Sequence, residues 1–321
     1  MTGTVTGRPV VAGVDNSESA RTAVLWAADE AMLRGRGLRL IRALDWPAGA
    51  PRPDEPYRRE NAPRHRGSHR AHATSWSVQT YEDPDRTPPV HGWGGRFRDA
   101  AEAVVVEAGA LAAARHPQLE IIESLVDGKP VDVLRAESEH AAMLVLGSRR
   151  LSSLTEMLTT GSIAAPVAAH ALCPVAVVRE REHDSSVSPS VVVGVDGSAR
   201  SEAAIAYAFD DASRRGAFLT AVLVVRTTGP HVSERATADG EVRLAESLAG
   251  WKAKYPDVTV RPQVTTGHTV KALVDKSEHA LSLVVGTRGF GGFRGMVLGS
   301  VSHGLIHHAR CPLVVVPSGD A

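Results

Sequence analysis

Cysteine and aromatic residues are scarce in this sequence. Two cysteines in 321 residues are too few for a disulfide framework, so we expect a protein of a reducing compartment, most simply the cytoplasm. Aromatic residues make up only 4% of the chain. The cores must therefore be built from Val, Leu, Ile and Ala, which is common where helices pack tightly on parallel strands.

Net charge and long apolar runs are missing as well. The 36 Lys and Arg residues balance the 36 Asp and Glu residues, so the chain has no general attraction to nucleic acid or to an anionic membrane. No apolar run approaches the ~18 residues of a membrane-spanning helix, and no apolar segment of signal-peptide length precedes the first predicted strand. We expect a soluble protein whose partners include neither nucleic acid nor a membrane.

A long segment of the sequence occurs twice. Val10–Leu44 aligns without a gap with Val191–Val225, and this alignment places Asp15 on Asp196. A second pair of similar segments places Gly161-Ser162 on Gly299-Ser300 and Cys173-Pro174 on Cys311-Pro312. Such self-similarity indicates tandem copies of one structural unit.

The tandem copies suggest two domains, which suits a chain of this length at ~100–200 residues per domain. We predict domains at 1–180 and 189–321, joined by the polar segment "REREHDSSVSPS". The first domain carries an insert, about 45–96, that is rich in Pro, Arg, His and Gly and has no apolar period. It is either a mobile loop or a basic contact for phosphate or a partner, through five arginines: Arg58, Arg59, Arg64, Arg66 and Arg70.

Each copy alternates short apolar runs with segments of helical period. In the second copy "VVVGV", "FLTAVLVV", "VTVRPQV", "LSLVVG" and "PLVVV" are typical of buried parallel strands. The segments between them, 241–255 among them, are predicted to be helices. Alternation of this kind predicts an α/β fold with parallel strands, right-handed crossovers and helices on both faces.

Glycines are concentrated between Val284 and His303. Gly286 ends a predicted strand, and Gly299-Ser300 begins the following helix. In an open α/β sheet, ligands bind beyond the carboxyl ends of the strands, and a helix N-terminus favours an anion. Bare backbone in this loop would let main-chain N–H groups approach phosphates. We also expect the Ser300 hydroxyl to cap the helix and to donate to phosphate.

The spacing Gly286-x-x-Gly289, nine residues, Gly299-Ser300 resembles the nucleotide loop of the universal stress protein family, in its ATP-binding class. "VVVGVDGS" and "CPLVVVP" are similar to that family's first and last strands. The resemblance implies two tandem five-stranded parallel sheets of the Rossmann-like, adenine-nucleotide alpha-hydrolase-like type, each with strand order 3-2-1-4-5. It also implies pairing through the fifth strands, either between the two halves or in a homo-oligomer.

The resemblance implies ATP as the cofactor, with or without Mg²⁺. Asp196 would lie against the adenine, and Val224 would contact the base through its backbone. Ribose and phosphates would be held by the loop residues Gly286, Arg288, Gly289, Gly299, Ser300 and Val301.

The first copy departs from this pattern, because Arg150 stands where the second glycine is expected. A long side chain there would obstruct the backbone approach, or it would attract phosphate as a charge. The candidate residues of this half are Asp15, Gly147, Gly161 and Ser162. We therefore expect the nucleotide mainly in the second domain.

No catalytic residue or metal site is predicted. His303 and His307 have metal-ligand spacing on one helix, but no third ligand is recognisable, and Cys173 and Cys311 are expected to be buried structural residues. We expect a nucleotide-dependent regulatory protein with an unidentified protein partner, and the resemblance implies that its role is in stress adaptation. A slow ATP hydrolase and a nucleotide-free scaffold are the alternatives.

Overall fold

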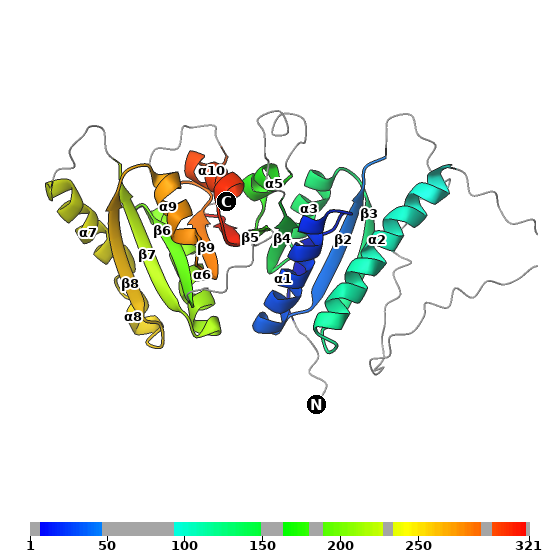
Figure 1. Ribbon diagram of the computed structural model, residues 1–321, viewed down its shortest axis with the longest axis horizontal. Coiled ribbons are helices and arrows are strands. Elements are labelled where there is room, and N and C mark those ends of the chain that lie inside the picture. Colours follow the sequence, from blue (N-terminus) through cyan, green and yellow to red (C-terminus); the bar gives the residue numbers. More distant parts are fainter. Residues whose placement is uncertain are drawn as a thin grey trace, which may run out of the picture.

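The computed structural model describes residues 7–46, 93–148, 163–179, 189–226, 234–289 and 297–318. The elements of the first half are β1 (Val10–Gly13), α1 (Glu18–Arg34), β2 (Leu38–Leu44), α2 (Trp93–Arg115), β3 (Ile121–Asp127), α3 (Pro130–Ser138), β4 (Met143–Gly147), α5 (Ala164–His170) and β5 (Val175–Val178). Those of the second half are β6 (Ser190–Val195), a 3₁₀ turn (Ala199–Ser201), α6 (Glu202–Arg215), β7 (Phe218–Val225), α7 (Glu234–Leu248), α8 (Trp251–Lys254), β8 (Val260–Thr266), α9 (Thr269–Ser277), β9 (Ser282–Gly286), α10 (Ser300–His308) and β10 (Leu313–Val316). Figure 1 shows the two halves side by side.

The strands form one ten-stranded sheet in the order β3-β2-β1-β4-β5-β10-β9-β6-β7-β8. Each half therefore has the predicted order 3-2-1-4-5, and within each half neighbouring strands are parallel. The two fifth strands pair antiparallel, with Val314 opposite Ala176, so the halves join edge to edge in a single sheet. This pairing within one chain protects two strand edges that would otherwise be open.

Small side chains set the spacing between helices and sheet. Ala23, Ala27 and Ala31 are fully buried at intervals of four along α1, so one face of the helix lies close against the strands. α1, α2, α6 and α7 cover one face of the sheet, and α3, α5, α9 and α10 cover the other. The inner strands β4, β5, β9 and β10 are buried on both sides, which explains why they are nearly continuous apolar runs, whereas the edge strands β3 and β8 are partly exposed.

Two helical expectations need correction. The predicted helix over 241–255 begins earlier, at Glu234, and is interrupted at Gly250, whose φ of 80° is left-handed and separates α7 from α8. Helix α2 begins at Trp93, inside the predicted insert 45–96. The five arginines proposed as a basic contact fall between 47 and 92, outside the described residues.

A buried ion-pair network joins the two halves where α1 meets α6. Glu30 and Asp211 are 1% and 0% exposed, and both accept hydrogen bonds or ion pairs from Arg34 and Arg215. Residues 30 and 34 occupy the same places in the first copy as 211 and 215 in the second, each pair lying 181 positions apart. The network is therefore built from the same two helix positions of each half.

Candidate functional site

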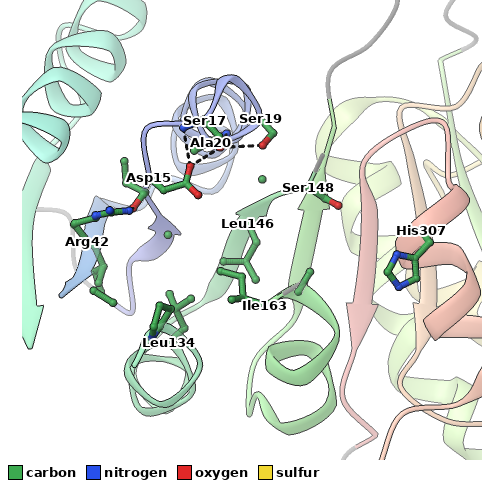
Figure 2. A pocket seen from close by; sticks show the side chains of 17 residues that line it. Asp15, Ser17, Ser19, Ala20, Arg42, Leu134, Leu146, Ser148, Ile163 and His307 are labelled. Atoms are coloured by element: carbon green, nitrogen blue, oxygen red, sulfur yellow. Dashed lines mark hydrogen bonds between the residues drawn. The ribbon is translucent and has the colours of Figure 1, made fainter. Parts of the chain in front are cut away.

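A cavity of about 270 Å³ opens at the carboxyl ends of β1, β2 and β4. Strand order reverses at this point, because β2 lies on one side of β1 and β4 on the other, and this is where open α/β sheets bind ligands. Its lining residues are Gly13, Val14, Asp15, Ser17, Ser19, Ala20, Ile41, Arg42, Ala43, Pro130, Leu134, Leu146, Gly147, Ser148, Ile163, Ala164 and His307. Figure 2 shows Asp15 on one side of the cavity and His307 on the other, with Ser148 between them.

Asp15 is held in a fixed orientation by the turn that follows β1. Its Oδ1 accepts a hydrogen bond of 2.8 Å from the Ser17 backbone N–H and a second one from the Ser17 hydroxyl. Ser17 in turn is the N-cap of α1 and accepts from the Ala20 N–H at 3.2 Å (Figure 2). The carboxylate of Asp15 therefore stabilises the turn, and Ser17 caps the helix.

Asp196 repeats this arrangement in the second half. Its Oδ1 accepts from the Ser198 N–H at 2.9 Å and from the Ser198 hydroxyl at 2.7 Å. Gly197, between them, has a φ of 81°. The turn therefore helps to hold the carboxylate at the end of β6.

Gly289 lies directly against Asp196. A Cβ built on Gly289 would stand 2.3 Å from Asp196 Oδ2, so no larger residue fits there without displacing the carboxylate. The second glycine of the loop and the first-strand aspartate, predicted to serve one site, are brought into contact. This proximity could not be read from residues that are 93 positions apart in the sequence.

Two hydrogen bonds bring the ends of the glycine loop together. The Gly299 N–H donates to the Thr287 carbonyl at 2.8 Å, and the Ser302 hydroxyl donates to the Gly286 carbonyl at 2.7 Å. Thr287 is itself tied to β10 through the carbonyl of Val316, at 3.0 Å. Gly286, Arg288 and Gly299 therefore lie together at the end of β9.

Arg288 contributes a cation to this end of the sheet. It is half-buried, and its Nε is shielded from solvent without a hydrogen-bond partner among the described residues. Ser300 is exposed and is the first residue of α10, but the N-cap is Gly299, so the expectation that Ser300 caps the helix is wrong. An exposed hydroxyl and a cation are compatible with an anionic ligand.

Val224 and Val301 are half-buried, on β7 and in the first turn of α10. Their counterparts in the first half, Ala43 and Ile163, both line the cavity there. The internal repeat therefore places both residues at the equivalent face of the second half.

Gly147 has a structural reason to be glycine. A Cβ at this position would lie 2.5 Å from the carbonyl carbon and oxygen of Ser19 and 2.7 Å from the Ala20 nitrogen. The end of β4 thus passes against the first turn of α1, whatever ligand is bound. Gly161, Ser162 and Arg150 lie outside the described residues.

Two cavity residues were missed by the sequence reasoning. Arg42 replaces an apolar residue, Leu223, of the second copy, and its Nη1 donates to the Val14 carbonyl at 3.2 Å. His307 comes from the second half, and in the sequence its spacing from His303 suggested only a metal ligand. Among the described residues no cluster of three metal-ligating side chains occurs.

Both cysteines are buried free thiols, as expected. Burial raises the pKa of Cys173 to about 12, so its thiol stays protonated and unreactive at neutral pH. No helix among the described residues is long and apolar enough to cross a membrane.

Comparisons with known proteins bear on this site. The sequence model of the Universal stress protein family matches residues 7–179 and again 189–317. Universal stress proteins Rv2005c and Rv2623 of Mycobacterium tuberculosis are 34% and 33% identical over 320 residues, covering 95% of this chain and 96% and 95% of theirs.

Solved structures are similar over nearly the whole chain. A universal stress protein from Archaeoglobus fulgidus has a TM-score of 0.64 at 20% identity, covering 98% of this chain and 97% of its own. A Pseudomonas aeruginosa protein of unknown function has a TM-score of 0.54 at 12% identity, covering 98% and 94%. At these identities the likeness concerns the fold.

Proposed function

Since this chain belongs to the universal stress protein family, we propose that it is a regulatory protein that binds ATP at the carboxyl ends of β6, β7 and β9, in its second half. The observation that carries this proposal is the contact between Gly289 and Asp196. It sets the main chain of Gly289 against a carboxylate at the switch point of the sheet, where α/β proteins bind nucleotides.

Each part of the site suits one part of the nucleotide. The Asp196 carboxylate is an acceptor held by Ser198, and adenosine offers it donors in the amino group of the base and in the ribose hydroxyls. At the other end, the Arg288 guanidinium and the exposed Ser300 hydroxyl offer donors to phosphate oxygens. Because Gly299 has no Cβ, phosphate oxygens can reach the N–H groups of the first turn of α10, which lack partners within the helix.

The first half supports the proposal because its equivalent residues have the same arrangement. Its equivalent positions enclose a cavity of about 270 Å³, with Asp15 held as Asp196 is. We assign ATP to the second half because the glycine spacing is complete only there. Mg²⁺, where present, would accompany the phosphates as their counter-ion, since the described residues offer it no cluster of three ligands.

We propose a binding role, in which nucleotide occupancy orders the site and biases a protein partner's contact. The free thiols suit a cytoplasmic location. Steady-state phosphate release separates this role from that of an ATP hydrolase. Turnover in the range of enzymes, on the order of 1–1000 per second, would contradict it.

The direct test is calorimetric titration of the full chain with ATP, together with mass spectrometry of ligand released from the purified protein. Asp196→Asn keeps the turn's acceptor oxygen but removes the charge. A hydrogen bond to a charged group contributes about 1.5–3 kcal/mol, so we expect ATP to bind about 10- to 100-fold more weakly.

Asp15→Asn is the matched control, because it makes the same change in the first half and should leave the second-half affinity unaltered. Gly289→Arg should abolish second-half binding, because its side chain must displace Asp196. The same arginine placed at Val242, an exposed position of α7, controls for added charge. Unchanged ATP affinity in Asp196→Asn, or a wild-type chain that binds no adenine nucleotide, would refute the proposal.

A further inference from the structure

A histidine from the second half lies at the cavity of the first half. His307 is in the last turn of α10, and α10 packs beside α5 across the junction of β5 and β10. The cavity is otherwise lined only by residues of the first half, as far as the described part of the chain extends. Figure 2 shows the imidazole on the side of Ser148, away from Asp15.

The first half itself fixes the end of α10 that carries this residue. Arg179, directly after β5, donates from Nη1 to the His307 carbonyl at 2.5 Å and from Nη2 to the Ile306 carbonyl. These are carbonyls of the last helical turn, which lack partners within the helix and favour a cation. The position of the imidazole therefore depends on a residue of the half whose cavity it reaches.

This contact has no equivalent in the opposite direction. When the two copies are aligned so that Cys173 corresponds to Cys311, His307 corresponds to Ala169 and His303 to Ala165. Helix α5 accordingly presents alanines where α10 presents imidazoles. The counterpart of Arg179 is Pro317, which has no side-chain donor with which to fix a helix end.

The surroundings of the imidazole favour its neutral form. Burial, together with the electrostatic effects of His303, Arg179 and His308, lowers the pKa of His307 below its ordinary value. The ring of His303 lies against it, with centroids 5.0 Å apart. A neutral imidazole offers one donor and one acceptor, which suits a ribose hydroxyl or a phosphate oxygen.

We propose that the first-half cavity is a composite site in which His307 of the second half hydrogen-bonds directly to a bound nucleoside monophosphate. The inference rests on the proposed adenine-nucleotide function. For the first half it adds a ligand-contacting residue, His307, and a smaller ligand, a nucleoside monophosphate. A volume of about 270 Å³ lies just under the ~300–1,000 Å³ of common small-molecule sites, which favours AMP over ATP. Asp15 receives the adenine base, and His307 receives the ribose or phosphate on the Ser148 side.

The test uses the full chain with Gly289→Arg, so that the second half is closed and AMP binding reports on the first half. In calorimetry, adding His307→Ala should weaken AMP about 3- to 10-fold, the worth of one neutral hydrogen bond. His308→Ala, an exposed neighbour on the same helix, should change nothing. His307→Gln, which keeps a donor and an acceptor, should restore most of the affinity.

A second readout separates ligand contact from a structural role. In the NMR spectrum of histidine-labelled chain, AMP should shift the His307 ring signals and leave those of His308 in place. An AMP affinity independent of residue 307, or unmoved His307 signals at saturation, would overturn the inference. So would AMP binding to the wild type that disappears entirely in Gly289→Arg, although the proposed function would then stand. If the wild type binds no adenine nucleotide, both fail.

Discussion

The buried ion-pair network between α1 and α6 leads to the sharpest prediction about stability. Arg215 donates from Nε to Asp211 at 2.9 Å and from Nη2 to Glu30, and its side chain is 19% exposed. Replacing it with Met keeps an unbranched apolar stem and removes the charge. Glu30 and Asp211, both almost completely buried, then share Arg34 as their ion-pair partner, and Asp211 keeps the hydrogen bond from the Ser282 hydroxyl at 3.0 Å.

The magnitude follows from the burial of the two carboxylates. Removing one partner of a buried ion pair costs about 3–5 kcal/mol, because an uncompensated charge stays in the interior. Arg215 retains some access to water, so we expect the lower end, about 3 kcal/mol of unfolding free energy. Domain stabilities are typically about 5–15 kcal/mol, so this loss is large.

Urea unfolding followed by circular dichroism measures the loss. Arg214→Met is the matched control. Arg214 precedes Arg215 on α6 and pairs with Asp210 at the surface, and such surface ion pairs contribute about 0–1 kcal/mol to stability. Replacing Glu30, Arg34, Asp211 and Arg215 together by apolar residues of similar volume should restore stability to the wild-type level or above it, since no charge then remains buried. If Arg215→Met and Arg214→Met have the same stability, the reasoning about this network is wrong.

Two further predictions concern Gly147 and His307. Gly147→Ala should lower the free energy of unfolding in urea by about 1–3 kcal/mol, because the new Cβ would lie 2.5 Å from the α1 backbone. Gly286→Ala should cost less, because the nearest atom to its Cβ would be 3.2 Å away. Equal costs for the two substitutions would contradict this reasoning. For His307, the unfolded chain binds a proton below about pH 6.5 that the folded chain, with its lowered pKa, does not yet bind. Stability should therefore fall with pH below about 6.5 by more in the wild type than in His307→Gln. A difference between the two proteins that is the same at pH 7.5 and 5.5 would exclude this contribution.

Much of the fold and part of the site can be predicted from the sequence. The gapless repeat of Val10–Leu44 predicts two copies of one unit, and the apolar runs predict parallel strands, because burial on both faces of a sheet selects such runs. The turn residues after β1 and β6 are equally local: an aspartate followed two positions later by a serine forms its own hydrogen bonds. The resemblance of the loop to a known family adds the strand order and the candidates Asp196 and Gly289.

Contacts across the two halves required the tertiary structure. Periodicity along a chain reports which face of an element is buried, but not which distant element covers it. Only the antiparallel pairing of β5 with β10 brings α10 to the first-half cavity, and so gives His307 a place there instead of in a metal site. The same pairing sets Glu30 against Arg215, and the close packing of β4 on α1 explains a glycine at 147 that the sequence could assign only to a ligand.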